Sequence, residues 1–169
     1  MTTNLHTFVG LYSRILDAAA HILTKGAAFA KANDISETEM LGWRLIDDME
    51  PLRFQLMVVA NFTQQWTARA VGLPLPADVS VDHDVQGFLT ALATSKAYLA
   101  KLTPDQFTGR DEVPLTVMIG TGMEPTLPAE QWLTVFATTN LYFHLSTAYG
   151  ILRAKGVPIG KVDLFPTGL

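Results

Sequence analysis

The chain has 169 residues, a formal net charge of −4 at pH 7 and no cysteine. Its charged share of 17% lies below the usual share of about 25%, and the acidic balance argues against a nucleic-acid partner, which would need clustered lysine and arginine. The lack of cysteine excludes disulfides, thiolate metal sites, iron–sulfur clusters and a cysteine nucleophile.

The length predicts a single domain over residues 1–169. Its first residues carry neither a basic run nor a long apolar run, so we expect no secretory signal and a cytoplasmic location. Residues 4–32 repeat apolar side chains at spacings of three and four, which indicates an amphipathic helix. Ser36 and Glu39 have the pattern of a capping box for a short helix over 37–43.

The next long helix is expected over 51–71, because a proline suits its first turn and glycine and proline follow its end. A third helix is predicted over 82–102, capped by Ser80 or Asp82. The β-rich stretch 113–126 contains a glycine turn and predicts a small hairpin.

A fourth long helix is expected over 128–155, followed by an irregular C-terminal tail over 157–169 that is rich in proline and glycine. These elements predict an all-α fold, a four-helix bundle with a small β-hairpin before its last helix.

The shortage of charge is concentrated in residues 54–68 and 131–152. The second segment is long enough to span a membrane, but its many polar residues would be unfavourable in lipid, so we expect no membrane partner. A bundle helix needs only one apolar face, and the surplus apolar surface of this helix must meet the hairpin, the tail or another subunit. A homodimer is the expected outcome, with the tail and hairpin as the alternative cover.

Asn140 and His144 are four residues apart and therefore share one face of this apolar helix. Each should need a polar partner if buried. We expect His6, His21 and His83 to be solvated, since they lie on polar helix faces or helix starts.

Three segments resemble a family of small bacterial and fungal proteins of unknown function within the DinB/YfiT-like superfamily. They are residues 48–52 (DMEPL) followed by Gln55, residues 140–153 (NLYFHLSTAYGILR) and residues 156–161 (GVPIGK). The resemblance extends over nearly the whole chain. It implies an up-down-down-up four-helix bundle that is often dimeric.

Members of this superfamily typically hold a divalent metal with three histidines, one on the second helix and two spaced four apart on the last. The characterised members include thiol-dependent transferases and isomerases. Here His144 matches the second of the paired positions, Asn140 stands at the first, and 51–71 contains no histidine. The resemblance therefore implies a degenerate metal site, to which Asp48 and Gln55 could add oxygen ligands.

Three interpretations of this region remain open. Asn140 and His144 join a buried hydrogen-bond network with Asp48, Gln55 or a backbone group; or the region is a metal-free small-molecule pocket; or His144 and Asp48 hold zinc, nickel or manganese. The pocket would be lined by Met49, Phe54, Trp66 and Tyr142.

We therefore expect a non-catalytic or small-molecule-binding homodimer with no cofactor. The alternative is a divalent-metal-dependent enzyme of thiol-transferase type that uses His144 and oxygen ligands.

Overall fold

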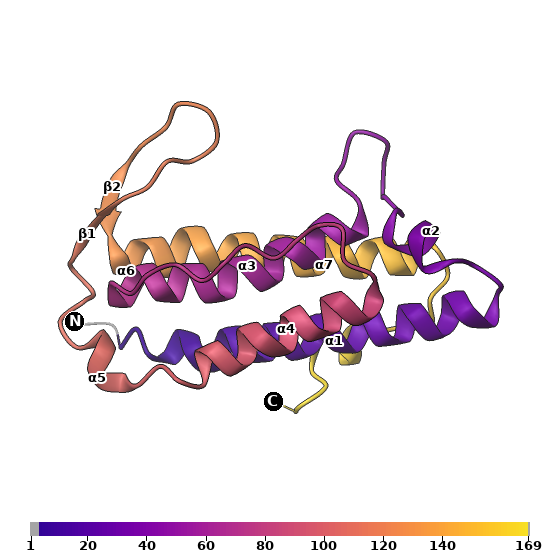
Figure 1. Ribbon diagram of the computed structural model, residues 1–169, viewed down its shortest axis with the longest axis horizontal. Coiled ribbons are helices and arrows are strands. Elements are labelled where there is room, and N and C mark those ends of the chain that lie inside the picture. The colour runs from indigo at the N-terminus through magenta and orange to yellow at the C-terminus, as the bar shows by residue number, and fades with distance from the viewer. Residues whose placement is uncertain (1–3, 169) are drawn as a thin grey trace.

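Four long helices lie side by side in the computed structural model, which describes residues 4–168 (Figure 1). They are α1 (Thr7–Ala32), α3 (Leu52–Val71), α4 (Val85–Leu99) and α7 (Thr138–Ala154). None of the helices in the described part of the chain is long and apolar enough to cross a membrane. The prediction of a mainly helical protein with one small hairpin is confirmed.

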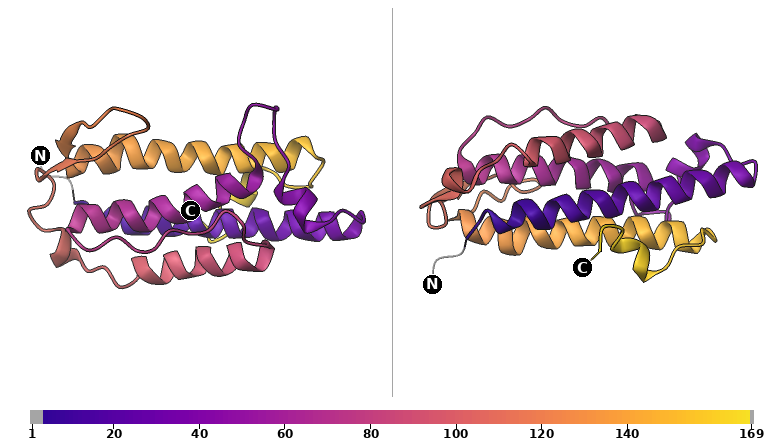
Figure 2. Two further views of the ribbon diagram at one scale, coloured as in Figure 1. Left: turned by 45° about the horizontal axis from the view of Figure 1, so that its top comes forward. Right: turned by 90° about the horizontal axis from the view of Figure 1, so that it is seen from below.

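Figure 1 shows α1 and α7 running in one direction and α3 and α4 in the opposite direction. Segment 72–84, which joins α3 to α4, returns along the bundle (Figure 2). Two buried polar side chains of α3 hold it there. The Asn61 side-chain oxygen accepts from the Val79 N–H at 2.8 Å, and the Gln64 amide donates to the Ala77 carbonyl at 3.2 Å.

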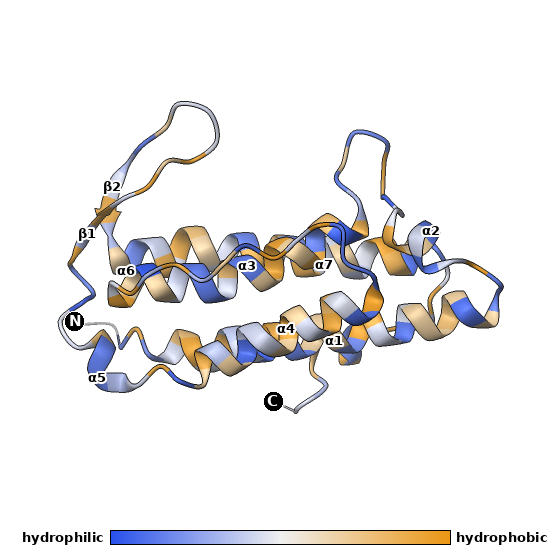
Figure 3. Ribbon diagram, in the orientation of Figure 1, coloured by the Kyte–Doolittle hydropathy of each residue, from blue (hydrophilic) through white to orange (hydrophobic). Residues whose placement is uncertain are grey.

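The core is formed by the apolar faces predicted from the helical spacing. Hydrophobic residues recur along all four long helices in Figure 3. On α1 the buried side chains include Tyr12, Ile15, Leu16, Ala19, Ile22 and Leu23. A fully buried aliphatic side chain of this kind stabilises the fold by roughly 1.5–3 kcal/mol. The charge-poor helix α3 packs against α1, α4 and α7, which explains why it carries so few charges.

The helix ends differ in part from those predicted. The Ser36 hydroxyl accepts from the Glu39 N–H and caps α2 (Glu37–Leu41), as predicted. Helix α4 begins later than expected, because Asp84 rather than Ser80 or Asp82 accepts a hydrogen bond from the N–H of its third residue. A further short helix, α5 (Pro104–Phe107), follows α4 and was not predicted.

The hairpin pairs β1 (Pro114–Thr116) with β2 (Thr126–Pro128) in antiparallel register, with Leu115 opposite Leu127. It is tied to the bundle by the indole N–H of Trp132, which donates to the Leu115 carbonyl at 2.9 Å.

The predicted helix 128–155 is not uniform. It consists of α6 (Ala129–Gln131), a π-helical turn η1 (Trp132–Ala137) and α7. The Leu133 carbonyl inside η1 accepts from the hydroxyls of Tyr12 on α1, at 3.1 Å, and Thr138, at 2.7 Å. Burial raises the pKa of the Tyr12 hydroxyl well above its ordinary value, so this group remains protonated and able to donate.

The C-terminal segment was predicted to be irregular, but it contains a 3₁₀ turn, η2 (Lys161–Leu164). The expectation of a solvated His21 is corrected as well. One Asp163 carboxylate oxygen lies 2.8 Å from both His21 Nε2 and Lys25 Nζ, which attaches η2 to α1. Lys25, the Gly160 N–H and His21 together hold the pKa of the Asp163 carboxyl well below its usual range.

Candidate functional site

A hydrogen bond between two side chains joins α7 to the start of α3. His144 Nδ1 lies 2.7 Å from the side-chain oxygen of Gln55. Gln55 is buried, and its side-chain nitrogen donates to the Glu50 carbonyl at 2.8 Å. This contact joins two helices at residues that are 89 positions apart in the chain.

The same contacts define the protonation of the histidine. Since a carbonyl can only accept, the Glu50 carbonyl orients the Gln55 amide with its nitrogen outward and its oxygen toward His144. His144 must then carry its proton on Nδ1, which leaves the lone pair on Nε2. Nε2 makes no hydrogen bond to another described residue and is not among the buried atoms that lack a partner, so solvent reaches it.

Aromatic rings surround this imidazole. The ring centroids of Phe54, Phe62 and Phe143 lie 6.0, 6.5 and 5.2 Å from that of His144. Burial lowers the pKa of His144 from 6.5 to about 4, because apolar surroundings disfavour the charged ring. His144 is therefore neutral at pH 7.

The structure does not bring the other two predicted polar residues to His144. The Asn140 side-chain nitrogen donates to the carbonyl of Phe136, which lies in the preceding turn η1, at 2.8 Å. Asp48 lies exposed in the loop before α3 and makes no hydrogen bond or ion pair to any described residue. The network therefore links His144 to Gln55 and the Glu50 carbonyl rather than to Asn140 or Asp48.

The residues predicted to line one pocket are also separated. Phe54 contacts the His144 ring, but Trp66 is linked to it only through Phe62, whose ring centroid lies 6.2 Å from that of Trp66 and 6.5 Å from that of His144. The Trp66 ring itself stacks on Trp132 at 5.0 Å. Tyr142 is 46% exposed and borders cavities that neither His144 nor Trp66 lines. Met49 is half-buried in the loop before α3.

A divalent metal does not fit the residues that stand at these positions. His144 supplies one nitrogen, the oxygen of Gln55 is already bonded to it, and Asp48 is elsewhere. Among the described residues, no group of three or more histidine, cysteine, aspartate and glutamate side chains lies together. A zinc-type site needs at least three such ligands, so the residues at these positions do not match one.

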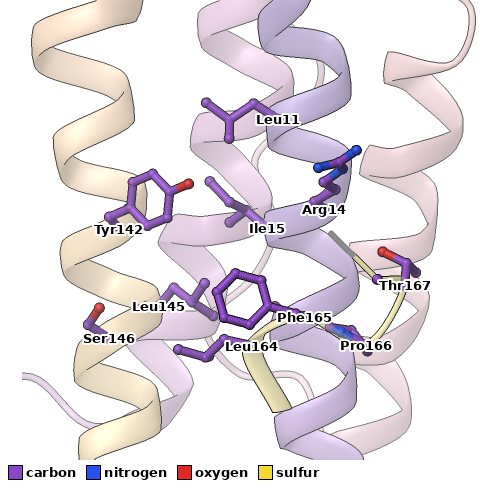
Figure 4. A pocket seen from close by; sticks show the side chains of 12 residues that line it. Leu11, Arg14, Ile15, Tyr142, Leu145, Ser146, Leu164, Phe165, Pro166 and Thr167 are labelled. Atoms are coloured by element: carbon purple, nitrogen blue, oxygen red, sulfur yellow. The ribbon is translucent and has the colours of Figure 1, made fainter. Parts of the chain in front are cut away.

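A cavity of about 330 Å³ lies between α1, α7 and the C-terminal segment. Figure 4 shows that Ile15 comes from α1, Leu145 from α7 and Phe165 from the C-terminal segment, and all three line the cavity. Its other lining residues are Leu11, Arg14, Ala18, Tyr142, Ser146, Leu164, Pro166, Thr167 and Gly168. The volume falls at the lower end of the range for small-molecule sites.

The sequence interpretation missed this cavity. Its third wall depends on the C-terminal segment, which Asp163 attaches to α1. Two signals were present in the sequence: Val157 and Ile159 are apolar residues that follow α7, and both are buried. Apolar residues in a proline- and glycine-rich tail indicate a segment that packs on the domain.

The comparisons with known proteins agree with the resemblance seen in the sequence, which is thereby confirmed. The crystal structure of a DinB family member protein from Shewanella denitrificans matches this chain with a TM-score of 0.87 and 26% sequence identity, over 95% of this chain and 91% of that one. No curated protein matches at a significant level. Residues 5–165 match the sequence profile of a domain of unknown function, DUF1993. The chain therefore belongs to the DUF1993 family and has a DinB-like fold.

Proposed function

We propose that this protein is a non-catalytic small-molecule-binding protein whose ligand lies in the cavity between α1, α7 and the C-terminal segment. The observation that carries the proposal is the lining of this cavity. Apolar side chains from three separate elements, Ile15, Leu145 and Leu164, converge on one space. Polar side chains join them there, which is the usual composition of a ligand site.

The polar lining residues support the proposal because they have no partner within the described chain. The side chains of Arg14, Tyr142, Ser146 and Thr167 make no hydrogen bond to any other described residue. On α7, His144 is bonded to Gln55 through Nδ1 and does not line this cavity, whereas Tyr142 and Ser146 do.

We also propose that the protein acts as a homodimer of up-down-down-up bundles, with the outer face of the last helix as the interface. Val135, Tyr142 and Phe143 are 59, 46 and 55% exposed on this helix, and Leu45 and Ile46 of the preceding loop are 45 and 60% exposed. Leu45, Tyr142 and Phe143 border the same shallow hollow. Neither the hairpin nor the tail lines that hollow, and a two-fold partner is the commonest cover for such a face. The cytoplasmic location stays a prediction.

Nuclear magnetic resonance titration with straight-chain alcohols tests the binding proposal. We expect 1-octanol to shift the backbone signals of residues around Ile15 and Leu145. Affinity should rise about fourfold per added methylene until the cavity is filled, since a buried methylene contributes about 0.8 kcal/mol.

The variant Leu11→Trp places a large ring at the half-buried edge of the cavity and should abolish binding. Ala97→Trp, at an exposed position of α4, makes the same kind of change away from the cavity and should bind normally. Shifts spread over the whole surface, or equal binding by both variants, would contradict the proposal.

Light scattering tests the homodimer. The wild-type protein should show twice the chain mass of 18.5 kDa, and Phe143→Ser should halve it. Met118→Ser is the matched control, because Met118 is equally exposed, at 57%, but lies on the hairpin. A wild-type protein of single-chain mass at micromolar concentration would refute the dimer.

A further inference from the structure

A positive charge at the edge of the cavity indicates which class of ligand would bind there. Arg14 is the one charged residue among those that line the cavity in the described chain. It is exposed and forms no hydrogen bond or ion pair with another described residue.

Two carboxylates on the elements that form the cavity, Asp17 of α1 and Asp163 of η2, are already engaged. Asp17, one turn further along α1, receives Lys96 of α4 at 2.6 and 2.8 Å. Asp163 of η2 receives His21 and Lys25. Within the described residues the Arg14 guanidinium therefore has no anionic partner.

A hydroxyl group lies on the α7 wall of the cavity, opposite Arg14 on α1. In Figure 4 the Tyr142 hydroxyl points from α7 toward α1, at the same end of the cavity as Leu11 and Arg14. A guanidinium group presents paired N–H donors that match the oxygens of a carboxylate or phosphate. Among the apolar residues that line the cavity, Ile15 of α1 and Leu145 of α7 are buried and Leu164 of η2 is half-buried.

We infer that the ligand is an amphipathic anion, whose short hydrocarbon chain lies between α1 and α7 and whose anionic head binds Arg14 at the edge of the cavity. This inference rests on the proposed binding function and adds the ligand class to it. A cavity of about 330 Å³ accommodates one short chain rather than a membrane lipid with two long ones.

Three probes of equal length separate the head group from the chain: octanoate, 1-octanol and octylammonium, each titrated below its aggregation concentration. At low ionic strength octanoate should bind about threefold to tenfold more tightly than 1-octanol, and octylammonium more weakly than both. The advantage of octanoate should fall toward onefold in 1 M salt, because the pair with an exposed arginine is screened.

The variant Arg14→Gln should remove the advantage of octanoate and leave the affinity for 1-octanol within twofold of the wild type. Lys101→Gln removes the same charge from an exposed position that does not line the cavity, and it should keep the advantage. If 1-octanol binds in the cavity but octanoate binds no more tightly, the inference about the head group is wrong and the binding function stands. If no probe binds, the proposed function itself fails.

Discussion

The contact between His144 and Gln55 gives the sharpest test of how this bundle is held together. We consider the variants His144→Phe and Gln55→Leu and their combination. Each replacement keeps a side chain of similar shape in place, so the cycle measures the hydrogen bond more than the packing. The two positions are joined directly, at 2.7 Å.

The single variants should each be destabilised. In His144→Phe the buried side-chain oxygen of Gln55 loses its partner, and a buried group left in this way costs about 1–3 kcal/mol. In Gln55→Leu the imidazole N–H is the orphaned group, with a smaller cost of about 1 kcal/mol because solvent reaches part of the ring. The double variant should lose less than the sum of the two, with a coupling free energy of about 1–2 kcal/mol.

The pH dependence gives an independent check, because the pKa of His144 is lowered from 6.5 to about 4 in the folded state. Between these values the unfolded chain binds a proton that the folded chain does not, so stability falls as pH decreases through this window. The full shift corresponds to about 2 kcal/mol between pH 7 and pH 5, and the partial exposure of the ring reduces this to about 1 kcal/mol.

Urea unfolding at pH 7 and pH 5 measures all these quantities. The wild-type protein should lose about 1 kcal/mol more than His144→Phe between the two pH values, because the variant lacks the titrating ring. Additive single variants would show that the contact contributes nothing. If the wild-type protein and His144→Phe lost the same free energy of unfolding between pH 7 and pH 5, His144 would not be held neutral by its surroundings.

Three other substitutions probe separate contacts by thermal or urea unfolding. Tyr12→Phe removes the hydroxyl that donates to the Leu133 carbonyl and should cost about 0.5–1.5 kcal/mol, and an unchanged stability would argue against a role for this bond in fixing η1. Gly26→Ala places a methyl group 2.8 Å from the buried Leu152 side chain, and this overpacking should outweigh the gain in helix propensity by about 1 kcal/mol; a more stable variant would show that Leu152 moves freely. Asp163→Asn should lower stability by about 1 kcal/mol and speed hydrogen exchange in η2, whereas unchanged exchange would show that the segment is held without this carboxylate.

The long helices could be predicted because their signals are local. Spacings of three and four within 4–32, and a glycine after Val71, depend only on neighbouring residues. The start of α4 was misplaced by three residues since several acceptors precede it, and only the structure shows that Asp84 caps it. Helix boundaries are uncertain in this way whenever two capping residues stand close together.

The π-helical turn could not be predicted, because its hydrogen bonding depends on a distant residue. The Tyr12 hydroxyl reaches the Leu133 carbonyl across 121 positions of the chain. The sequence around Leu133 reads as ordinary helix. The partner of His144 was easier to anticipate, since Gln55 lies in a segment that the family resemblance had already drawn attention to.

The location of the candidate site follows from which neighbour each side of α7 contacts. Position 144 points to α3, where Gln55, Phe54 and Phe62 engage it. Positions 142 and 146 are turned away from α3 and border the cavity formed with α1 and the C-terminal segment. Because the first face has too few ligands for a metal and the second has unpartnered polar groups, a search for function should begin with Tyr142, Ser146 and Arg14 rather than with the histidine.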